Sequence, residues 1–136
     1  MAAPVILVID DSTLERESIA RLLEYEGFKT VRAANGKEAY ASLYTTTPDL
    51  ILLDLMMPEM DGVTFLRMVR RSTQWEHVPV IVLSGVTDED WRLDRARELH
   101  IDDLIPKAKF GFDDLLQRVK RITSSKNSPA VSPPAL

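Results

Sequence analysis

The stretch VILVIDDS, residues 5–12, places five apolar residues directly before two adjacent aspartates. The run 5–9 is short, continuous and rich in β-branched side chains, which is typical of a strand buried on both faces. Such strands belong to parallel sheets that helices cover. Asp10 and Asp11 repel each other, so their position at the end of a buried strand calls for a counter-charge. The stretch therefore predicts both a type of sheet and a charged site.

The same pattern continues along the chain, because apolar segments alternate with amphipathic ones. The predicted strands are 5–9, 28–33, 50–53, 80–83 and 103–105, and the predicted helices are 12–26, 37–44, 63–71, 88–99 and 113–122. Gly27 stands where a helix commonly ends. Parallel neighbours need crossover connections, so the alternation predicts an α/β fold: a doubly wound, five-stranded parallel sheet with helices on both faces.

Composition limits the classes of protein to consider. The 136 residues suit one domain, 45% of them are apolar, and the net charge of −4 gives no sign of direct nucleic-acid binding. There is no cysteine and no apolar run near the roughly 20 residues of a membrane helix. We expect a cytoplasmic protein with no membrane association. Residues 4–122 form the predicted domain, and the Ser- and Pro-rich residues 123–136 a disordered tail or linker.

Chemically active side chains follow the predicted strands. Asp10 and Asp11 follow the first strand, Asp54 the third, Ser84 the fourth and Lys107 the fifth. In an open parallel sheet these ends meet at one edge, where ligands bind. Each residue alone has an ordinary interpretation as a cap, a turn or a surface group, but the coincidence of all five favours a site.

Three clustered carboxylates favour a divalent cation, and magnesium accepts a few carboxylates, water and phosphate oxygens as ligands. Lys107 would add positive charge and Ser84 a hydroxyl donor, while a carboxylate can itself be the nucleophile. These are the parts that phosphoryl transfer requires. The sequence thus predicts a magnesium-dependent phosphoryl-transfer site.

Four blocks, VILVIDDS, PDLILLDLMMPEMDG, VPVIVLSG and DDLIPK, resemble the receiver domain of two-component response regulators, in the same order. The resemblance spans residues 4–122. It implies a flavodoxin-like sheet with strand order 2-1-3-4-5. It also implies that Asp54 is the phosphoacceptor, that Ser84 engages the phosphoryl group after transfer, and that Lys107 contacts a phosphoryl oxygen. Mg²⁺, with Mn²⁺ as a substitute, would be held by Asp10, Asp11, Asp54 and the Met56 backbone carbonyl, with Asp11 and Asp54 as the direct ligands.

The resemblance also implies partners. A sensor histidine kinase or a phosphotransfer protein would supply the phosphoryl group, and an output partner would bind the face made by the fourth helix, the fifth strand and the fifth helix. Such a domain is not an enzyme on an external substrate, although it contributes to its own phosphotransfer and dephosphorylation. A flavin carrier or an Asp-x-Asp phosphatase fits the Asp10-Asp11-Ser12 sequence poorly.

Three positions depart from the family pattern. Leu104 stands where the family usually has Tyr or Phe, Ala108 replaces a proline, and Gly85 replaces a common alanine. The missing aromatic side chain removes the usual switch, and Ala108 predicts a trans peptide bond after Lys107. These departures keep open an alternative function as a phosphate-independent interaction module, which the five intact site residues oppose.

Overall fold

Five strands form a single parallel sheet in the computed structural model, which describes residues 3–57, 60–85 and 91–127. They are β1 (Val5–Ile9), β2 (Lys29–Ala33), β3 (Leu50–Asp54), β4 (Val80–Ser84) and β5 (Asp103–Pro106). Their order in the sheet is β2-β1-β3-β4-β5, with every neighbouring pair parallel. The predicted doubly wound fold and its strand order are confirmed.

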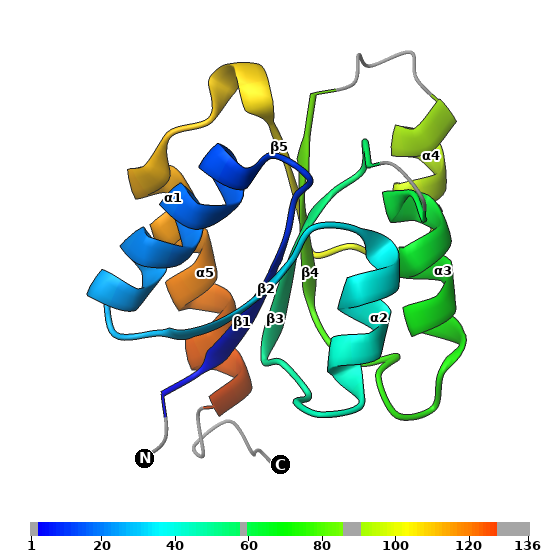
Figure 1. The fold of residues 1–136 in the computed structure, drawn as a ribbon, viewed down its shortest axis with the longest axis horizontal. Coiled ribbons are helices and arrows are strands. Elements are labelled where there is room, and N and C mark those ends of the chain that lie inside the picture. The colour runs from blue at the N-terminus through cyan, green and yellow to red at the C-terminus, as the bar shows by residue number, and fades with distance from the viewer. Residues whose placement is uncertain (1–2, 58–59, 86–90, 128–136) are drawn as a thin grey trace, which may run out of the picture.

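Helices cover both faces of the sheet (Figure 1). They are α1 (Thr13–Tyr25), α2 (Gly36–Leu43), α3 (Gly62–Arg71), α4 (Trp91–Glu98) and α5 (Phe112–Asn127), and a 3₁₀ turn at Lys107–Lys109 follows β5. α1 and α5 lie on one face, and α2, α3 and α4 on the other (Figure 1). Among the described residues, none of the helices combines the length and apolar character that crossing a bilayer requires.

Two apolar cores result from this arrangement, one on each face of the sheet. Side chains alternate along β1, so Ile6 and Val8 join the core of α1 and α5, whereas Leu7 and Ile9 join the core on the opposite face. β3 and β4 are likewise buried along their whole length. The continuous apolar runs of the sequence therefore have the predicted cause, which is burial of the strands on both faces.

Among the described helix boundaries, only the end of α5 differs from the sequence prediction by more than one residue. α5 does not end at residue 122 but continues through Asn127, because Thr123 is buried and its hydroxyl donates to the Val119 carbonyl at 2.8 Å. The division between domain and tail stays a prediction, since residues from 128 on lie outside the described part of the chain. The start of the helix predicted from residue 88 stays untested, because residues 86–90 lie outside the described part of the chain and α4 is described only from Trp91.

Two glycines fix the connections around the sheet. Gly27 has a φ of 100° and follows α1 where the chain turns into β2, as predicted. Gly62 opens α3, and a Cβ atom there would lie only 2.7 Å from the Asp54 carbonyl oxygen and 2.6 Å from the Leu55 Cα. The start of α3 can therefore press against the end of β3 only because residue 62 has no side chain.

Candidate functional site

Three carboxylates meet at the carboxyl edge of the sheet. Asp10 and Asp11 follow β1, and Asp54 ends β3, the neighbouring strand, in which Leu53 lies opposite Ile9. One oxygen of each of the three carboxylates lies within 4.8 Å of the others. The parallel register thus brings together residues that are more than forty positions apart in the sequence.

The two inner carboxylates are buried and held by backbone amides. Asp10 is 2% exposed and Asp54 is 3% exposed, whereas Asp11 is exposed. The Ser12 amide donates to Asp10 Oδ1 at 2.9 Å, and the Met56 amide donates to Asp54 Oδ1 at 3.0 Å. One oxygen of each buried carboxylate is therefore fixed by the chain that follows it, and the other is left for a cation.

Lys107 supplies that cation in this structure. Its Nζ donates to Asp10 Oδ2 and to Asp54 Oδ2, each at 3.3 Å, and lies 3.1 Å from Glu15 Oε1. The lysine reaches the site because the 3₁₀ turn directly follows β5 at the same edge. Sequence reasoning did not select Glu15. The only signal for it is the Ser-x-x-Glu pattern of residues 12–15, which usually indicates nothing more than a helix cap.

Burial and charge shift the pKa values of the site in opposite directions. Burial raises the pKa of Asp54 to about 6, although the Met56 amide and the Lys107 charge act against it. Burial raises the pKa of Asp10 as well. Burial alone would lower the pKa of Lys107, but the negative charges of Asp54 and Asp10 outweigh it and raise that pKa. One lysine thus offsets only part of the crowded negative charge.

The donor set fits a hard divalent cation. Three carboxylates offer oxygen ligands close together, and Asp54 is energetically costly to ionise without additional positive charge. The exposed side of the cluster opens on a cavity of about 250 Å³, lined by Asp11, Leu55, Met56, Met57, Asp61 and Arg92. Water and phosphate oxygens, which Mg²⁺ keeps in its coordination shell, have room there. That the Met56 carbonyl is a ligand stays a prediction.

Ser84 lies at the same edge as the carboxylates. It ends β4 opposite Pro106 and is 3% exposed, while the residue before it, Leu83, lies opposite Asp54. The structure therefore places all five of the residues selected from the sequence along one edge, in the order of strands β1, β3, β4 and β5.

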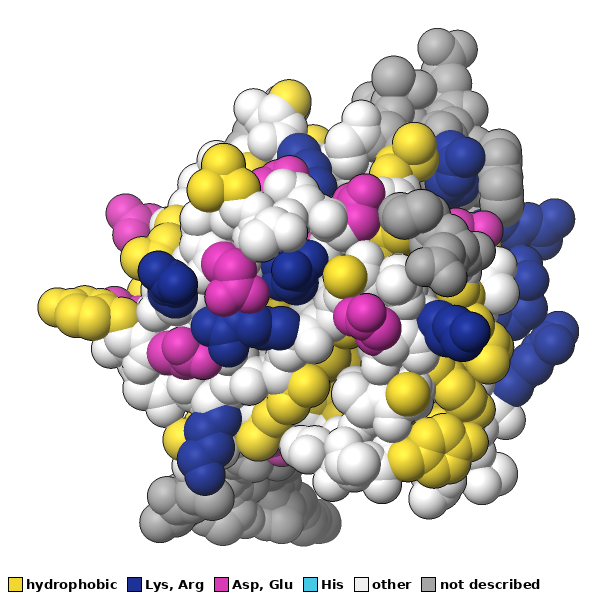
Figure 2. Space-filling view, in the orientation of Figure 1, with side chains coloured by type: hydrophobic (Ala, Val, Ile, Leu, Met, Phe, Trp, Pro, Cys, Tyr) yellow, Lys and Arg dark blue, Asp and Glu magenta, His cyan; other side chains and the backbone are white. Residues whose placement is uncertain are grey.

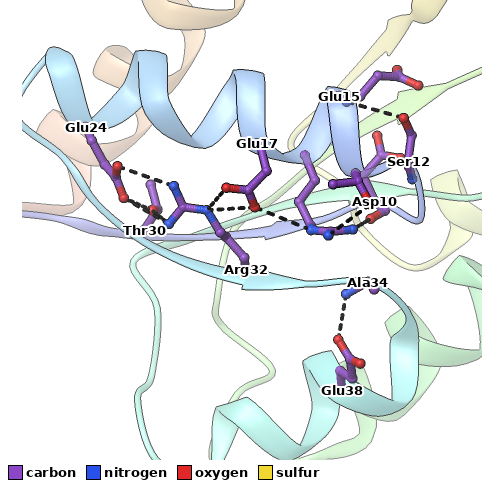
Figure 3. A network of polar contacts seen from close by, with 11 residues as sticks. Asp10, Ser12, Glu15, Glu17, Glu24, Thr30, Arg32, Ala34 and Glu38 are labelled. Atoms are coloured by element: carbon purple, nitrogen blue, oxygen red, sulfur yellow. Dashed lines mark hydrogen bonds and ion pairs between the residues drawn. The ribbon is translucent and has the colours of Figure 1, made fainter.

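A chain of ion pairs supports the acidic end of β1. Arg16 donates to the Asp10 carbonyl at 2.9 Å and contacts Glu17, which in turn pairs with Arg32 at 3.0 Å. Arg32 also pairs with Glu24 at 3.0 Å, so the chain runs from Asp10 along one side of α1 (Figure 3). The turn that carries Asp10 is thereby tied to both α1 and β2.

The structure describes the surroundings of the three residues that depart from the family pattern, Leu104, Ala108 and Gly85. Leu104 is partly buried and packs against the core of α2, α3 and α4. Ala108 lies in the 3₁₀ turn, and no peptide bond between described residues is cis. A Cβ atom on Gly85 would meet only the Lys107 Cδ, at 3.8 Å, so the alanine that is common in the family would fit here.

The profile of the response regulator receiver domain family matches residues 6–120. This chain belongs to that family. The receiver domain is 34% identical, over 90% of its length, to the phosphate regulon transcriptional regulatory protein PhoB of Pseudomonas aeruginosa, and it covers 52% of that protein. It is 36% identical, over 96% of its length, to the alkaline phosphatase synthesis transcriptional regulatory protein SphR of Synechococcus elongatus, and covers 53% of it. The chain thus spans about half the length of these relatives.

A solved structure agrees with this assignment. The signal receiver domain of a signal transduction histidine kinase from Syntrophus aciditrophicus is 34% identical and superposes with a TM-score of 0.85, covering 98% of this chain and all of that one. Receiver domains are signalling domains, not enzymes that act on an external substrate.

The expectation of no direct nucleic-acid contact finds no support in these comparisons, because the two relatives are transcriptional regulatory proteins. Figure 2 shows that Lys and Arg side chains gather along one side of the molecule, over α3 and α4. On α4, Arg95 pairs with Glu98 at 3.3 Å and Arg97 pairs with Asp94 at 3.7 Å. The expectation rests on the net charge of −4 and on the lack of a basic stripe in the sequence, where Arg67, Arg70 and Arg71 form only a short cluster, and it stays a prediction.

Proposed function

We propose that this receiver domain accepts a phosphoryl group on Asp54 from a phosphohistidine of a sensor kinase or a phosphotransfer protein. The observation that carries the proposal is the position of Asp54. Its buried carboxylate has one oxygen held by the Met56 amide and the other facing Lys107, within a cluster of three carboxylates. A nucleophilic oxygen is thereby fixed beside a cation, which is the arrangement that phosphoryl transfer needs.

The transfer itself is a displacement at phosphorus. An oxygen of Asp54 forms a bond to phosphorus while the bond between phosphorus and the donor imidazole nitrogen breaks, and the imidazole leaves as it takes up a proton. Lys107 lies where it can pair with a phosphoryl oxygen, and Ser84 offers a hydroxyl at the same edge. The product is an acyl phosphate on Asp54.

Mg²⁺ is the metal that we propose for the site, with Mn²⁺ as a substitute. Asp10, Asp11, Asp54 and the Met56 carbonyl would hold it, with Asp11 and Asp54 as direct ligands. A bound Mg²⁺ supplies the positive charge that offsets the cluster and the incoming phosphoryl oxygens. Asp11 suits a direct ligand because it is exposed and borders the cavity beside the site.

Incubation with Mg²⁺ and acetyl phosphate, followed by intact mass measurement, tests the proposed function. We expect the mass of one phosphoryl group on the wild-type chain and none on Asp54→Asn. The matched control is Asp113→Asn, which removes an exposed carboxylate from the first turn of α5 and should leave the mass increase unchanged. If the wild-type chain gained no mass with any phosphodonor, the phosphate-independent module would be the better account.

Output through the face of α4, β5 and α5 is also part of the proposal. Asp103 of β5 pairs with Arg118 at 2.6 Å and with Arg121 at 3.4 Å, both from α5, so β5 and α5 are joined on this face by ion pairs. Leu104, partly buried against the other core, favours the phosphate-independent alternative, since the family's aromatic side chain is missing there. Binding of the output partner to phosphorylated and unphosphorylated protein would distinguish the two.

A further inference from the structure

At the start of α1, the Glu15 carboxylate does not take part in capping the helix. Ser12 and Glu15 form the Ser-x-x-Glu pattern, in which the glutamate side chain ordinarily accepts a hydrogen bond from the amide of the cap residue. Here the Ser12 amide donates to Asp10 Oδ1 instead. Only the other half of the pattern is present, in which the Ser12 hydroxyl accepts a hydrogen bond from the Glu15 amide at 3.3 Å (Figure 3). Because Asp10 replaces Glu15 in the cap, the Glu15 carboxylate reaches Lys107.

Lys107 is consequently in contact with three carboxylates, as many as an ammonium group has N–H donors. The three contacts differ in burial. The side chains of Asp10 and Asp54 are 3% exposed, whereas that of Glu15 is 47% exposed. The Glu15 carboxylate can return to water at little cost, so it is the partner that an incoming anion displaces most easily from Lys107.

We propose that Glu15 is a specificity-determining residue that disfavours strongly anionic phosphodonors; this rests on the proposed phosphorylation of Asp54. A phosphoryl oxygen that approaches Lys107 from solvent meets the negative charge of Glu15 and must displace it. The repulsion grows with the charge of the donor. Glu15 therefore selects against small, highly charged metabolite phosphates and in favour of less anionic donors.

The test compares two donors on two variants at pH 7 and low ionic strength. Acetyl phosphate is a dianion at this pH and phosphoramidate a monoanion. Glu15→Gln removes the charge beside Lys107. Glu26→Gln, at the far end of α1 where Glu26 pairs with Lys120 at 3.5 Å, changes net charge equally and serves as the control. We expect Glu15→Gln to accelerate phosphorylation by acetyl phosphate about fivefold and by phosphoramidate about twofold, and Glu26→Gln to change neither appreciably.

Salt dependence and anion binding provide two further measurements, which would not change if the role of Glu15 were purely structural. The advantage of Glu15→Gln with acetyl phosphate should shrink at about 1 M salt, where the screening length falls to about 3 Å. The beryllium trifluoride anion, a phosphoryl mimic, should bind Glu15→Gln about threefold more tightly than the wild type with Mg²⁺ present, as measured by the shift in melting temperature.

The outcomes separate this inference from the proposed function. If the wild type is phosphorylated but Glu15→Gln accelerates both donors equally, or neither, the role of Glu15 is overturned and the phosphoacceptor function stands. If the wild type accepts a phosphoryl group from neither donor and does not bind beryllium trifluoride, the proposed function is overturned, and the inference with it.

Discussion

At the scale of single residues, Asp54 shows that the site is built at a cost in stability. Its carboxylate is buried beside Asp10, and Lys107 offsets the combined charge only in part, so that the pKa of Asp54 rises to about 6. A raised pKa means that folding disfavours the ionised form. The free energy of unfolding therefore falls as pH rises through the interval between the unfolded value, near 4, and about 6.

Asp54→Asn should accordingly stabilise the fold in the absence of Mg²⁺. We expect its free energy of unfolding at pH 8 to exceed that of the wild type by up to about 3 kcal/mol, because the amide carries no charge to bury. The gain should be complete above pH 6 and vanish below about pH 4, where the carboxyl is protonated in both states. Urea unfolding in the presence of EDTA measures it. A gain that is independent of pH would contradict this account.

Lys107→Met should have the opposite effect. Without the ammonium group, the two buried carboxylates lose their common cation, so we expect the free energy of unfolding at pH 8 to fall by about 2 kcal/mol. Added Mg²⁺ should restore more stability to this variant than to the wild type, because the metal then provides the missing positive charge. Thermal unfolding with and without Mg²⁺ gives the comparison. Equal Mg²⁺ effects in the two proteins would mean that Lys107 and the metal do not share the same carboxylates.

At the scale of elements, the contact between α3 and β3 depends on Gly62. Its missing Cβ allows the helix to begin against the backbone of Asp54 and Leu55, neither of which can move without shifting the end of β3. The position of the phosphoacceptor is therefore coupled to the start of α3.

Gly62→Ala should destabilise the fold by about 1–3 kcal/mol, since the new methyl group must displace backbone atoms. Gly85→Ala is the matched control: Gly85 has no positive φ, a Cβ there would make only an ordinary contact of 3.8 Å with the Lys107 Cδ, and the free energy of unfolding should change by less than about 0.5 kcal/mol. Urea unfolding of both variants checks this. If the two substitutions lowered the free energy of unfolding equally, the close contact between α3 and the end of β3 would not be what requires a glycine at position 62.

At the scale of the whole molecule, the sequence predicted the fold because burial on both faces leaves a clear pattern. Uninterrupted apolar runs such as 50–53 fit few structures other than a covered parallel strand. The convergence of Asp10, Asp54, Ser84 and Lys107 followed from the same rule, because the carboxyl ends of parallel strands share one edge. Strand order came from the family resemblance, since the alternation of strands and helices does not encode which strands become neighbours.

What sequence reasoning missed depends on contacts between distant segments. The importance of Glu15 arises only because Asp10 takes over the cap of α1 and because Lys107, more than ninety residues away, arrives beside it. The end of α5 was placed too early because serine, threonine and asparagine suggest a tail. Burial of Thr123 and its hydrogen bond to Val119 override that local preference.

The most direct measurement of the central claim is the position of the phosphoryl group. Borohydride reduces an aspartyl phosphate to homoserine, which peptide mass spectrometry can locate in the chain. After incubation with Mg²⁺ and a phosphodonor, we predict homoserine at position 54 and at no other aspartate, with none formed when EDTA replaces Mg²⁺. Homoserine at Asp10 or Asp11, or equal modification without divalent metal, would contradict the account.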